Sequence, residues 1–338
     1  MEDCPSLPGQ TGSPLNRDGA LLFQREMPSR LDIPVVFLVF NRPEPTARVF
    51  ARIRDARPAK LFVVADGPRP DHIGDAEKCR RVRELIAEGI DWPCEVVRDY
   101  AEKNLGSGRR VASGITKAFE AVEEAVILED DCLPDPSFFP FCAELLARYR
   151  NEPRVGLIGG APHVDNVVRG GESYFFCRYG YTWGWATWRR AWARFDYSMR
   201  TWAAWRDSGG LQELFPRSAV RKFWSRAWEH AASNPDDIWD YQWVYCYMRA
   251  GMLGLLPRTA LVENIGFGAE ATHTTTHVRG SQPTKPMVFP LIHPCTIEPD
   301  LVAEARASER FFSRPNLVVR AIRRFRQWCG RLRRSLAS

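Results

Sequence analysis

Four short apolar runs recur along the first part of the chain, and segments with helical spacing separate them. The runs are rich in β-branched and aromatic residues, and they are Ile33–Phe40, Leu61–Ala65, Cys94–Arg98 and Ala125–Leu128. Such runs are typical of strands that are buried on both faces of a sheet. Because they alternate with helices, they predict an α/β fold with a mostly parallel, Rossmann-like sheet flanked by helices.

Helical patterns follow these runs. Asp135 and Pro136 match the N-cap and the first position of a helix, and Val155–Ile158 predicts a further strand. The helix before the fourth strand has apolar residues at three- to four-residue spacing. These residues are Val111, Ile115, Phe119 and Val122.

Polar residues directly follow three of the predicted strands. They are Asn41 and Arg42, Asp66 and Gly67, and Glu129, Asp130 and Asp131. Ligands bind at the carboxyl ends of the strands in open α/β sheets. Each group alone could be an ordinary turn, but the three together predict one shared site.

The acidic triplet 129–131 carries the strongest chemical signal. Adjacent carboxylates repel one another and raise each other's pKa unless a cation neutralises them. Mg²⁺ or Mn²⁺, held by one or two carboxylates and completed by substrate phosphates, is a common solution. The alternative is a solvent-exposed acidic turn. Gly106–Gly108, before a helix, could present N–H groups to an anion or form a tight turn.

Charge is distributed unevenly along the chain. Lys and Arg number 47 and Asp and Glu 41, which gives a formal net charge of +6. Eight arginines and no acidic residue lie in 314–338, so the rest carries 39 basic and 41 acidic residues. A nearly neutral body offers no broad basic surface for a phosphate backbone, which argues against nucleic-acid binding.

Other classes of protein are also disfavoured. The longest apolar run is far shorter than the ~20 residues of a spanning helix, and the first 30 residues lack an apolar signal segment. Nine cysteines without a Cys-x-x-Cys pair predict reduced thiols and no zinc site, as in a cytoplasmic protein. Dinucleotide, P-loop and hydrolase motifs are absent.

The motifs resemble the nucleotide-sugar-binding domain of GT-A fold glycosyltransferases. Asp66-Gly67, the triplet 129–131 and the Phe-Phe helix after Pro134 are similar to the family of N-acetylglucosaminyltransferase I and the protein O-mannose N-acetylglucosaminyltransferase, with its bacterial relatives. The resemblance extends from about residue 33 to 276 and is firmest over Ala125–Tyr149. Tyr181–Trp185 resembles the family's Gly-Trp segment.

On the donor side, the resemblance implies a role for each strand-end residue. Arg42 and Asp66 would lie beside the nucleotide base, which would be uracil. Asp131 would ligate Mn²⁺ or Mg²⁺. Asp130 would reach the ribose or a metal-bound water, and Glu129 would orient the pair.

Two further segments carry implied roles. Trp239–Trp243 resembles the family's Trp-Asp segment, although its spacing departs by one residue, and Asp240 would deprotonate the acceptor hydroxyl. Asp236 and Asp237 are competitors for this role, and a capping or surface Asp is the structural alternative. His273, after a Gly-Phe-Gly turn, would close the diphosphate side, on the metal or on a phosphate.

Tryptophan is concentrated in one region, because ten of the twelve lie between Trp183 and Trp243. This region predicts a helical and irregular lobe over the sheet. Four-residue spacings suggest that most of these rings pack in a core. Trp183 and Trp185 are the candidates for an acceptor groove, since aromatic faces stack on sugar rings.

The predicted organisation has five parts. These are a flexible segment 1–30, a nucleotide-sugar-binding half 31–160, an acceptor half 161–290, a linker 291–313 and a basic amphipathic helix 314–338. In the last part, apolar residues share one helix face, bordered by arginines. This pattern predicts peripheral attachment to the anionic inner face of a membrane. Docking on the protein's own acidic surface is the alternative.

The sequence therefore predicts a metal-dependent, inverting glycosyltransferase. It would move a sugar from a UDP-sugar donor to a glycan or a lipid-linked acceptor, in the synthesis of cell-surface polysaccharide or glycolipid. One alternative is a membrane-associated interaction protein without activity. A sugar-nucleotide pyrophosphorylase is disfavoured, because the first strand is followed by Asn41–Pro45 and not by a Gly-rich basic loop.

Overall fold

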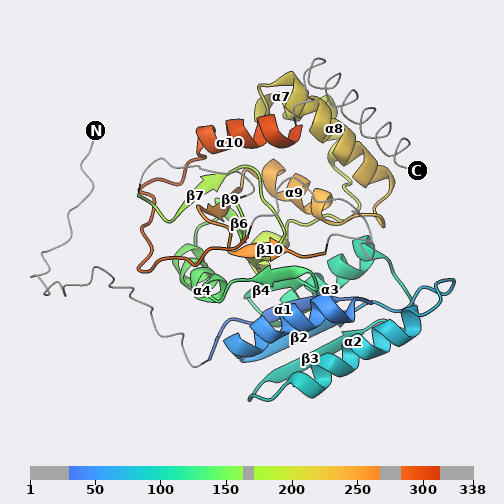
Figure 1. Ribbon diagram of the computed structural model, residues 1–338. Helices are drawn as coiled ribbons and strands as arrows, with labels where there is room; N and C mark the ends of the chain where they lie inside the picture. The colour runs from blue at the N-terminus through green and yellow to red at the C-terminus, as the bar shows by residue number, and fades with distance from the viewer. Residues whose placement is uncertain (1–29, 163–170, 267–282, 313–338) are drawn as a thin grey trace, which may run out of the picture.

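An eight-stranded sheet runs through the centre of the molecule (Figure 1). The computed structural model describes residues 30–162, 171–266 and 283–312. The strand order is β3-β2-β1-β4-β8-β6-β9-β7. The strands are β1 (Val35–Val39), β2 (Lys60–Ala65), β3 (Glu95–Tyr100), β4 (Glu124–Glu129), β6 (Val155–Gly159), β7 (Tyr174–Cys177), β8 (Trp185–Trp188) and β9 (Leu253–Pro257).

The sheet is mostly parallel. Strands β3, β2, β1 and β4 are parallel neighbours, and so are β6 and β9. Strand β8 lies antiparallel between β4 and β6, and β7 is antiparallel to β9. A separate antiparallel pair joins β5 (Cys132–Pro134) to β10 (Val262–Asn264). The predicted α/β fold with a mostly parallel sheet is confirmed.

Ten α-helices are present among the described residues. They are α1 (Pro43–Ala56), α2 (Asp75–Gly89), α3 (Ser107–Ala121), α4 (Phe138–Tyr149), α5 (Arg189–Trp192), α6 (Trp202–Asp207), α7 (Gly210–Leu214), α8 (Ser218–Ser233), α9 (Asp240–Arg249) and α10 (Leu301–Ala307). A π-helical turn, Ser308–Phe312, follows α10. None of the helices in the described ranges combines the length and the apolar character that a membrane span requires.

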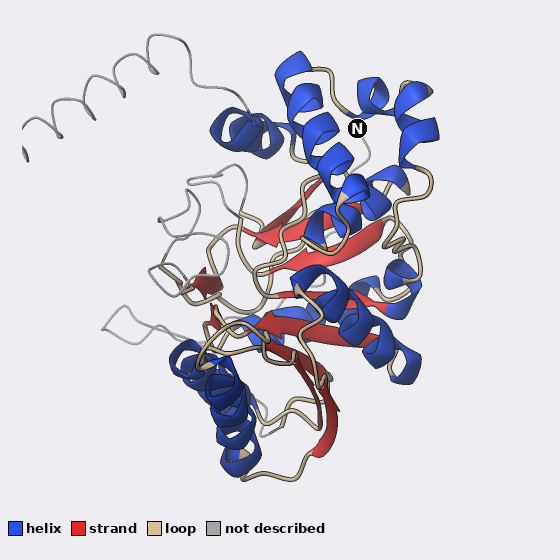
Figure 2. Ribbon diagram, turned by 90° about the vertical axis from the view of Figure 1, so that its right-hand side faces the viewer, coloured by secondary structure: helices blue, strands red, loops and turns tan. Residues whose placement is uncertain are grey.

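The helices form two layers, one on each face of the sheet (Figure 2). Successive residues of a strand point to opposite faces. Val36 and Leu38 of β1 therefore pack with α3, α8 and α9, whereas Val35 and Phe37 pack with α1, α2 and α4. Burial on both faces explains why the first strands consist of almost uninterrupted apolar residues.

The second half of the chain contributes more strands than expected. The sequence predicted a helical and irregular lobe between Trp183 and Trp243, but β8 within this region, and β7 and β9 on either side of it in the sequence, continue the same sheet. Helices α5 to α9 do form the lobe, and its tryptophans interlock as a core. Trp224 and Trp228, for example, stack with ring centroids 4.9 Å apart.

The predicted start of one helix is wrong. Helix α4 begins at Phe138, because Asp135 directly follows β5 and its N–H donates to Leu261 O at 2.8 Å. The predicted linker 291–313 contains α10, which is capped by the Asp300 side chain and buries Ala303. The parts 1–29 and 313–338 lie outside the described residues, as does His273.

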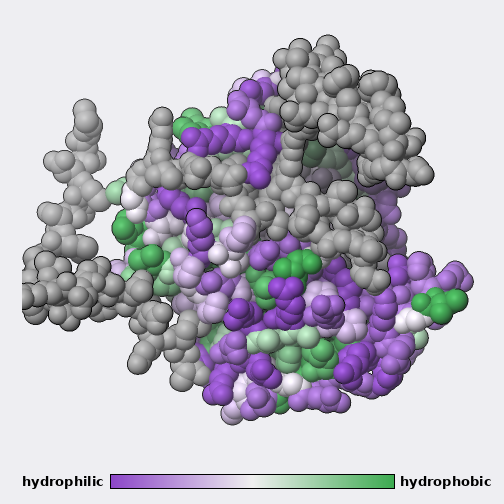
Figure 3. Space-filling model, in the orientation of Figure 1, coloured by the Kyte–Doolittle hydropathy of each residue, from purple (hydrophilic) through white to green (hydrophobic). Residues whose placement is uncertain are grey.

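The described surface on the face in Figure 3 is mainly hydrophilic, with several small and separate hydrophobic areas. Scattered apolar residues of this kind are normal on folded proteins.

Candidate functional site

A cavity of about 410 Å³ opens at the carboxyl ends of β1, β2 and β4. Its volume falls in the range of small-molecule sites. Nine of its lining residues are charged, and they are Arg42, Arg69, Arg110, Asp66, Glu129, Asp130, Asp131, Asp236 and Asp237. The cavity thus brings together the residues that the sequence assigned to a donor site, while their chemical roles stay predictions.

Arg42 lies at the N-cap position of α1 and pairs with two carboxylates. One guanidinium nitrogen forms an ion pair with Asp130, and the other lies 3.0 Å from Asp131 Oδ2. Burial alone would lower the pKa of Arg42, but the charges of Asp130 and Asp131 hold it above the ordinary value. Arg42 is therefore a permanent cation in the cavity wall.

Asp130 and Glu129 are held where a negative charge is costly. Burial raises the pKa of Asp130 to about 6, although Arg42 opposes this shift. Burial also raises the pKa of Glu129 well above its usual range, and the charges of Asp131, Asp130 and Asp240 add to the effect. Arg42 thus pairs with Asp130 and Asp131, while the raised pKa of Glu129 favours its uncharged form.

Asp240 is the first residue of α9 and is half-buried. Burial raises its pKa to about 6, while a hydrogen bond from Tyr241 N, 2.9 Å long, opposes the shift. Trp239, the residue before Asp240, stacks on Trp185, and Trp185 is paired with Ile127 of β4, so the start of α9 lies near β4. Asp236 and Asp237, the competitors of Asp240, line the cavity directly.

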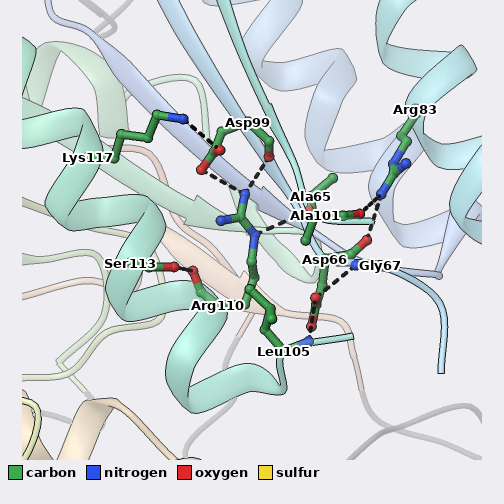
Figure 4. A network of polar contacts seen from close by, with 10 residues as sticks. All are labelled: Ala65, Asp66, Gly67, Arg83, Asp99, Ala101, Leu105, Arg110, Ser113 and Lys117. Atoms are coloured by element: carbon green, nitrogen blue, oxygen red, sulfur yellow. Dashed lines mark hydrogen bonds and ion pairs between the residues drawn. The ribbon is translucent and has the colours of Figure 1, made fainter. Parts of the chain in front are cut away.

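The Asp66 carboxylate organises the loop after β3 (Figure 4). Its Oδ1 accepts hydrogen bonds from Gly67 N at 2.8 Å and from Leu105 N at 2.9 Å. Its Oδ2 accepts one from Asn104 Nδ2 at 3.0 Å. Burial raises the pKa of Asp66 despite these hydrogen bonds. Asn104, which also lines the cavity, was missed by the sequence analysis.

Arg110 on α3 is a second residue that the sequence analysis missed (Figure 4). It is buried, with its Nε 3.2 Å from Ala65 O and its Nη2 2.8 Å from Asp99 Oδ2. Basic residues in the first turn of a helix oppose the helix dipole. An arginine at that position therefore indicates that an acidic partner compensates for the unfavourable dipole. Here the partner is Asp99 of β3.

The N-terminus of α3 is joined to the segment before α9. Gly108 N donates to Asp236 O at 3.1 Å, and Ser107 Oγ donates to Asp237 O at 3.2 Å. Arg109 also pairs with the Asp236 side chain at 3.0 Å. A Cβ atom on Gly108 would lie 2.5 Å from Asp236 O, so this close approach requires glycine.

Arg69 is the third cation of the cavity lining and was also missed. Its guanidinium lies over the Phe40 ring, 5.4 Å from the centroid. Asp75 holds it through two hydrogen bonds of 2.6 and 3.0 Å. Asp75 also accepts from Asn41 at 2.7 Å, which fixes the turn after β1 to α2.

Trp183 and Trp185, the two candidates for an acceptor groove, lie in different environments. Trp183 is half-buried and lines the cavity. Trp185 is fully buried in β8, and its ring stacks on Trp239 with centroids 5.7 Å apart. The expectation that Trp185 lines a groove is therefore wrong, because β8 lies inside the sheet and no face of the ring is accessible to a sugar.

The donor set fits a divalent cation only in part. Within the described residues, no group of three or more His, Cys, Asp or Glu side chains could hold a metal ion. Asp130 and Asp131 are nevertheless hard oxygen ligands on a cavity wall. They fit an ion that takes its other ligands from phosphate oxygens and water, as Mg²⁺ and Mn²⁺ commonly do.

Comparisons with known proteins give distant similarities. No family model and no curated protein matches the chain. Among solved structures, an inositol-1-phosphate CTP transferase from T. maritima has a TM-score of 0.36 and 10% identity, covering 67% of this chain and 85% of that one. A mannosyltransferase from Pyrobaculum calidifontis, in complex with GDP-Man and Mn²⁺, has a TM-score of 0.36 and 15% identity, with coverages of 66% and 69%.

The galactosyltransferase LgtC, in complex with donor and acceptor sugar analogs, is a further example. Its TM-score is 0.34 and its identity 13%, covering 66% of this chain and 73% of that one. These three TM-scores are below 0.5, so the similarities do not decide what the chain does. The function has to be argued from the cavity.

Proposed function

We propose that the chain is a GT-A type glycosyltransferase that uses a nucleoside diphosphate sugar as donor. The observation that carries the proposal is the cavity of about 410 Å³ at the ends of β1, β2 and β4, with strand-terminal carboxylates in its wall. Open α/β sheets bind their ligands at this edge. The motif resemblance to the N-acetylglucosaminyltransferase I family supports UDP as the nucleotide.

Charge supports a diphosphate ligand together with a divalent cation. The acidic triplet alone would repel a diphosphate, whereas Asp131, with Asp130, would hold Mn²⁺ or Mg²⁺ against it. When bound, such an ion stabilises the negative charge that grows on the departing nucleoside diphosphate. Arg42 is a further cation at the same wall. Asp66 and Asn104 would form the side that faces the base.

Asp240 is the favoured general base. In a direct displacement, the acceptor hydroxyl attacks the anomeric carbon, loses its proton to the base and inverts that centre. A pKa of about 6 leaves Asp240 ionised at neutral pH, yet more basic than an ordinary Asp. Tyr197 and Arg109 lower the pKa of Asp236, which makes it a weaker base. Trp183 is the candidate for stacking on the acceptor.

The experiment measures donor binding by isothermal calorimetry. A panel of UDP-sugars is titrated with and without Mn²⁺, and Mn²⁺-dependent hydrolysis of each donor is followed in parallel. We expect Asp131→Asn to abolish the Mn²⁺-dependent part of both signals. Asp55→Asn is the control, because Asp55 is an exposed residue of α1. If Asp131→Asn leaves both signals unchanged, the proposal fails.

The same panel separates the alternatives. Binding of a nucleoside triphosphate, with pyrophosphate released in the presence of a sugar phosphate, would favour a pyrophosphorylase. The absence of any donor binding would favour an interaction protein.

A glycan or lipid-linked acceptor and attachment to the cytoplasmic face of a membrane are part of the proposal. The attachment depends on the basic segment 314–338, which lies outside the described residues. Co-sedimentation with anionic liposomes should be lost when this segment is deleted. Equal co-sedimentation of the full chain and of the chain without 314–338 would contradict attachment through this segment.

A further inference from the structure

Arg42 occupies both carboxylates that a metal ion would need. Its side chain is 16% exposed, against 4% for Asp130 and 15% for Asp131. The two ion pairs use different guanidinium nitrogens, so one arginine bridges the two acids. The three charged groups are largely removed from bulk water. At such a buried site, water does not easily replace either partner of an ion pair.

Other cations of the cavity have partners of their own. Arg69 pairs with Asp75, and Arg110 pairs with Asp99. Within the described part of the chain, Arg42 is thus the cation that pairs with Asp130 and Asp131. A divalent ion that binds Asp130 and Asp131 must therefore displace or share the guanidinium of Arg42.

The backbone and the side chain of Arg42 are held in different ways. The backbone carbonyl accepts from Thr46 N at 3.1 Å and from Thr46 Oγ1 at 2.6 Å, which fixes it to the first turn of α1. The hydrogen bonds of the side chain, among described residues, go to the carboxylates. The guanidinium can therefore leave the acids without disturbing the helix.

We propose that Arg42 is a built-in counter-ion that competes with the divalent cation for Asp130 and Asp131. This inference rests on the proposed function. Without donor, the arginine keeps the carboxylates neutralised and weakens metal binding. With donor, the released guanidinium faces the anionic diphosphate, so that metal and donor bind cooperatively. Cooperativity of this kind is a coupling between two sites and is reciprocal.

The test measures binding of Mn²⁺ alone, by electron paramagnetic resonance of the free ion. Arg42→Gln removes the competing charge, so we expect Mn²⁺ to bind about tenfold more tightly than to the wild type, within the usual range of coupling energies. Arg52→Gln, on the exposed side of α1, is the matched control and should leave the affinity unchanged. Mn²⁺ should also raise the melting temperature of Arg42→Gln more than that of the wild type.

A purely structural arginine gives a different result. Arg42→Gln would then be less stable, and Mn²⁺ would bind no more tightly than to the wild type, which overturns the inference. If Arg42→Gln does not fold, Arg42→Lys replaces it. A lysine is a point charge without the planar fork, so it should bridge the acids less well and give a smaller gain in affinity. Unchanged or weaker Mn²⁺ binding by this variant also overturns the inference.

The two proposals fail separately. A wild-type protein that binds no UDP-sugar in the presence of Mn²⁺ contradicts the proposed function. The comparison of Mn²⁺ affinities needs no nucleotide, so it still decides whether Arg42 competes with the cation.

Discussion

Replacing Asp240 by Asn should slow sugar transfer strongly while making the protein more stable at neutral pH. Its pKa is raised from 3.8 to about 6, chiefly by burial. The folded state therefore binds a proton more tightly than the unfolded chain. Proton binding by Asp240 therefore adds to the free energy of unfolding. This contribution is fully present below pH ~4 and is lost as the pH rises through about 6. A shift of two units corresponds to about 3 kcal/mol, which Asn would recover at pH 7 because it carries no charge.

Asp240→Asn should lower the rate of the reaction, although it raises the stability. A carboxyl with a pKa of about 6 is about nine-tenths ionised at pH 7 and about one-tenth ionised at pH 5. The kcat/KM of the wild type should thus fall close to tenfold with each pH unit below 6. Asp240→Asn should lower kcat by about 10²- to 10⁴-fold, the usual contribution of a general base.

The assay follows release of the nucleoside diphosphate from the best donor of the panel between pH 5 and 8, and urea unfolding gives the stability at pH 7. Asp237→Asn is the matched variant, because Asp237 lines the cavity and competes for the role of base. A flat pH profile between 5 and 7, or an Asp240→Asn variant with near wild-type kcat, would refute the reasoning. A large loss in Asp237→Asn alone would assign the base to Asp237.

Three further changes test the walls of the cavity. Arg110→Leu should destabilise the fold by about 3 kcal/mol in urea unfolding, because it removes a buried ion pair with Asp99. Gly108→Ala should cost about 1–3 kcal/mol and weaken donor binding, since its Cβ would lie 2.5 Å from Asp236 O. Asp66→Asn should cost about 1–3 kcal/mol, because the new amide cannot accept all the hydrogen bonds that the carboxylate now accepts.

Ser113→Ala is the control for these three variants, since Ser113 is an exposed residue of α3. It should unfold at the wild-type urea concentration. Wild-type stability of Arg110→Leu would mean that its contacts with Asp99 and Ala65 contribute nothing. An unchanged donor affinity in Gly108→Ala would show that the segment before α9 does not shape the donor site.

Strand-end residues could be located from the sequence because their signal is local. Arg42, Asp66 and the triplet 129–131 each follow an apolar run, and a strand of known polarity has only one carboxyl end. The parallel neighbours β1, β2 and β4 then bring these residues to one edge. The candidate donor side of the cavity was therefore predictable from each apolar run and from the polar residues that directly follow the run.

The acceptor side was less predictable because it depends on contacts between distant segments. Trp185 carries the same local pattern as Trp183, but β8 is inserted between β4 and β6 and buries it. The late start of α4 likewise follows from the pairing of β5 with β10. By contrast, the Asp300 N-cap of α10 was a local signal that the sequence analysis overlooked.

The sequence by itself determined the α/β class and the cluster of carboxylates at the end of β4, because both arise from residues within a few positions of each other. Only the tertiary structure decided how those carboxylates are neutralised. Arg42 and Asp130 are 88 positions apart, and their ion pair exists because β1 and β4 are adjacent in the sheet. Neutralisation of a buried charge depends on which strands become neighbours, and strand order is a property of the whole chain.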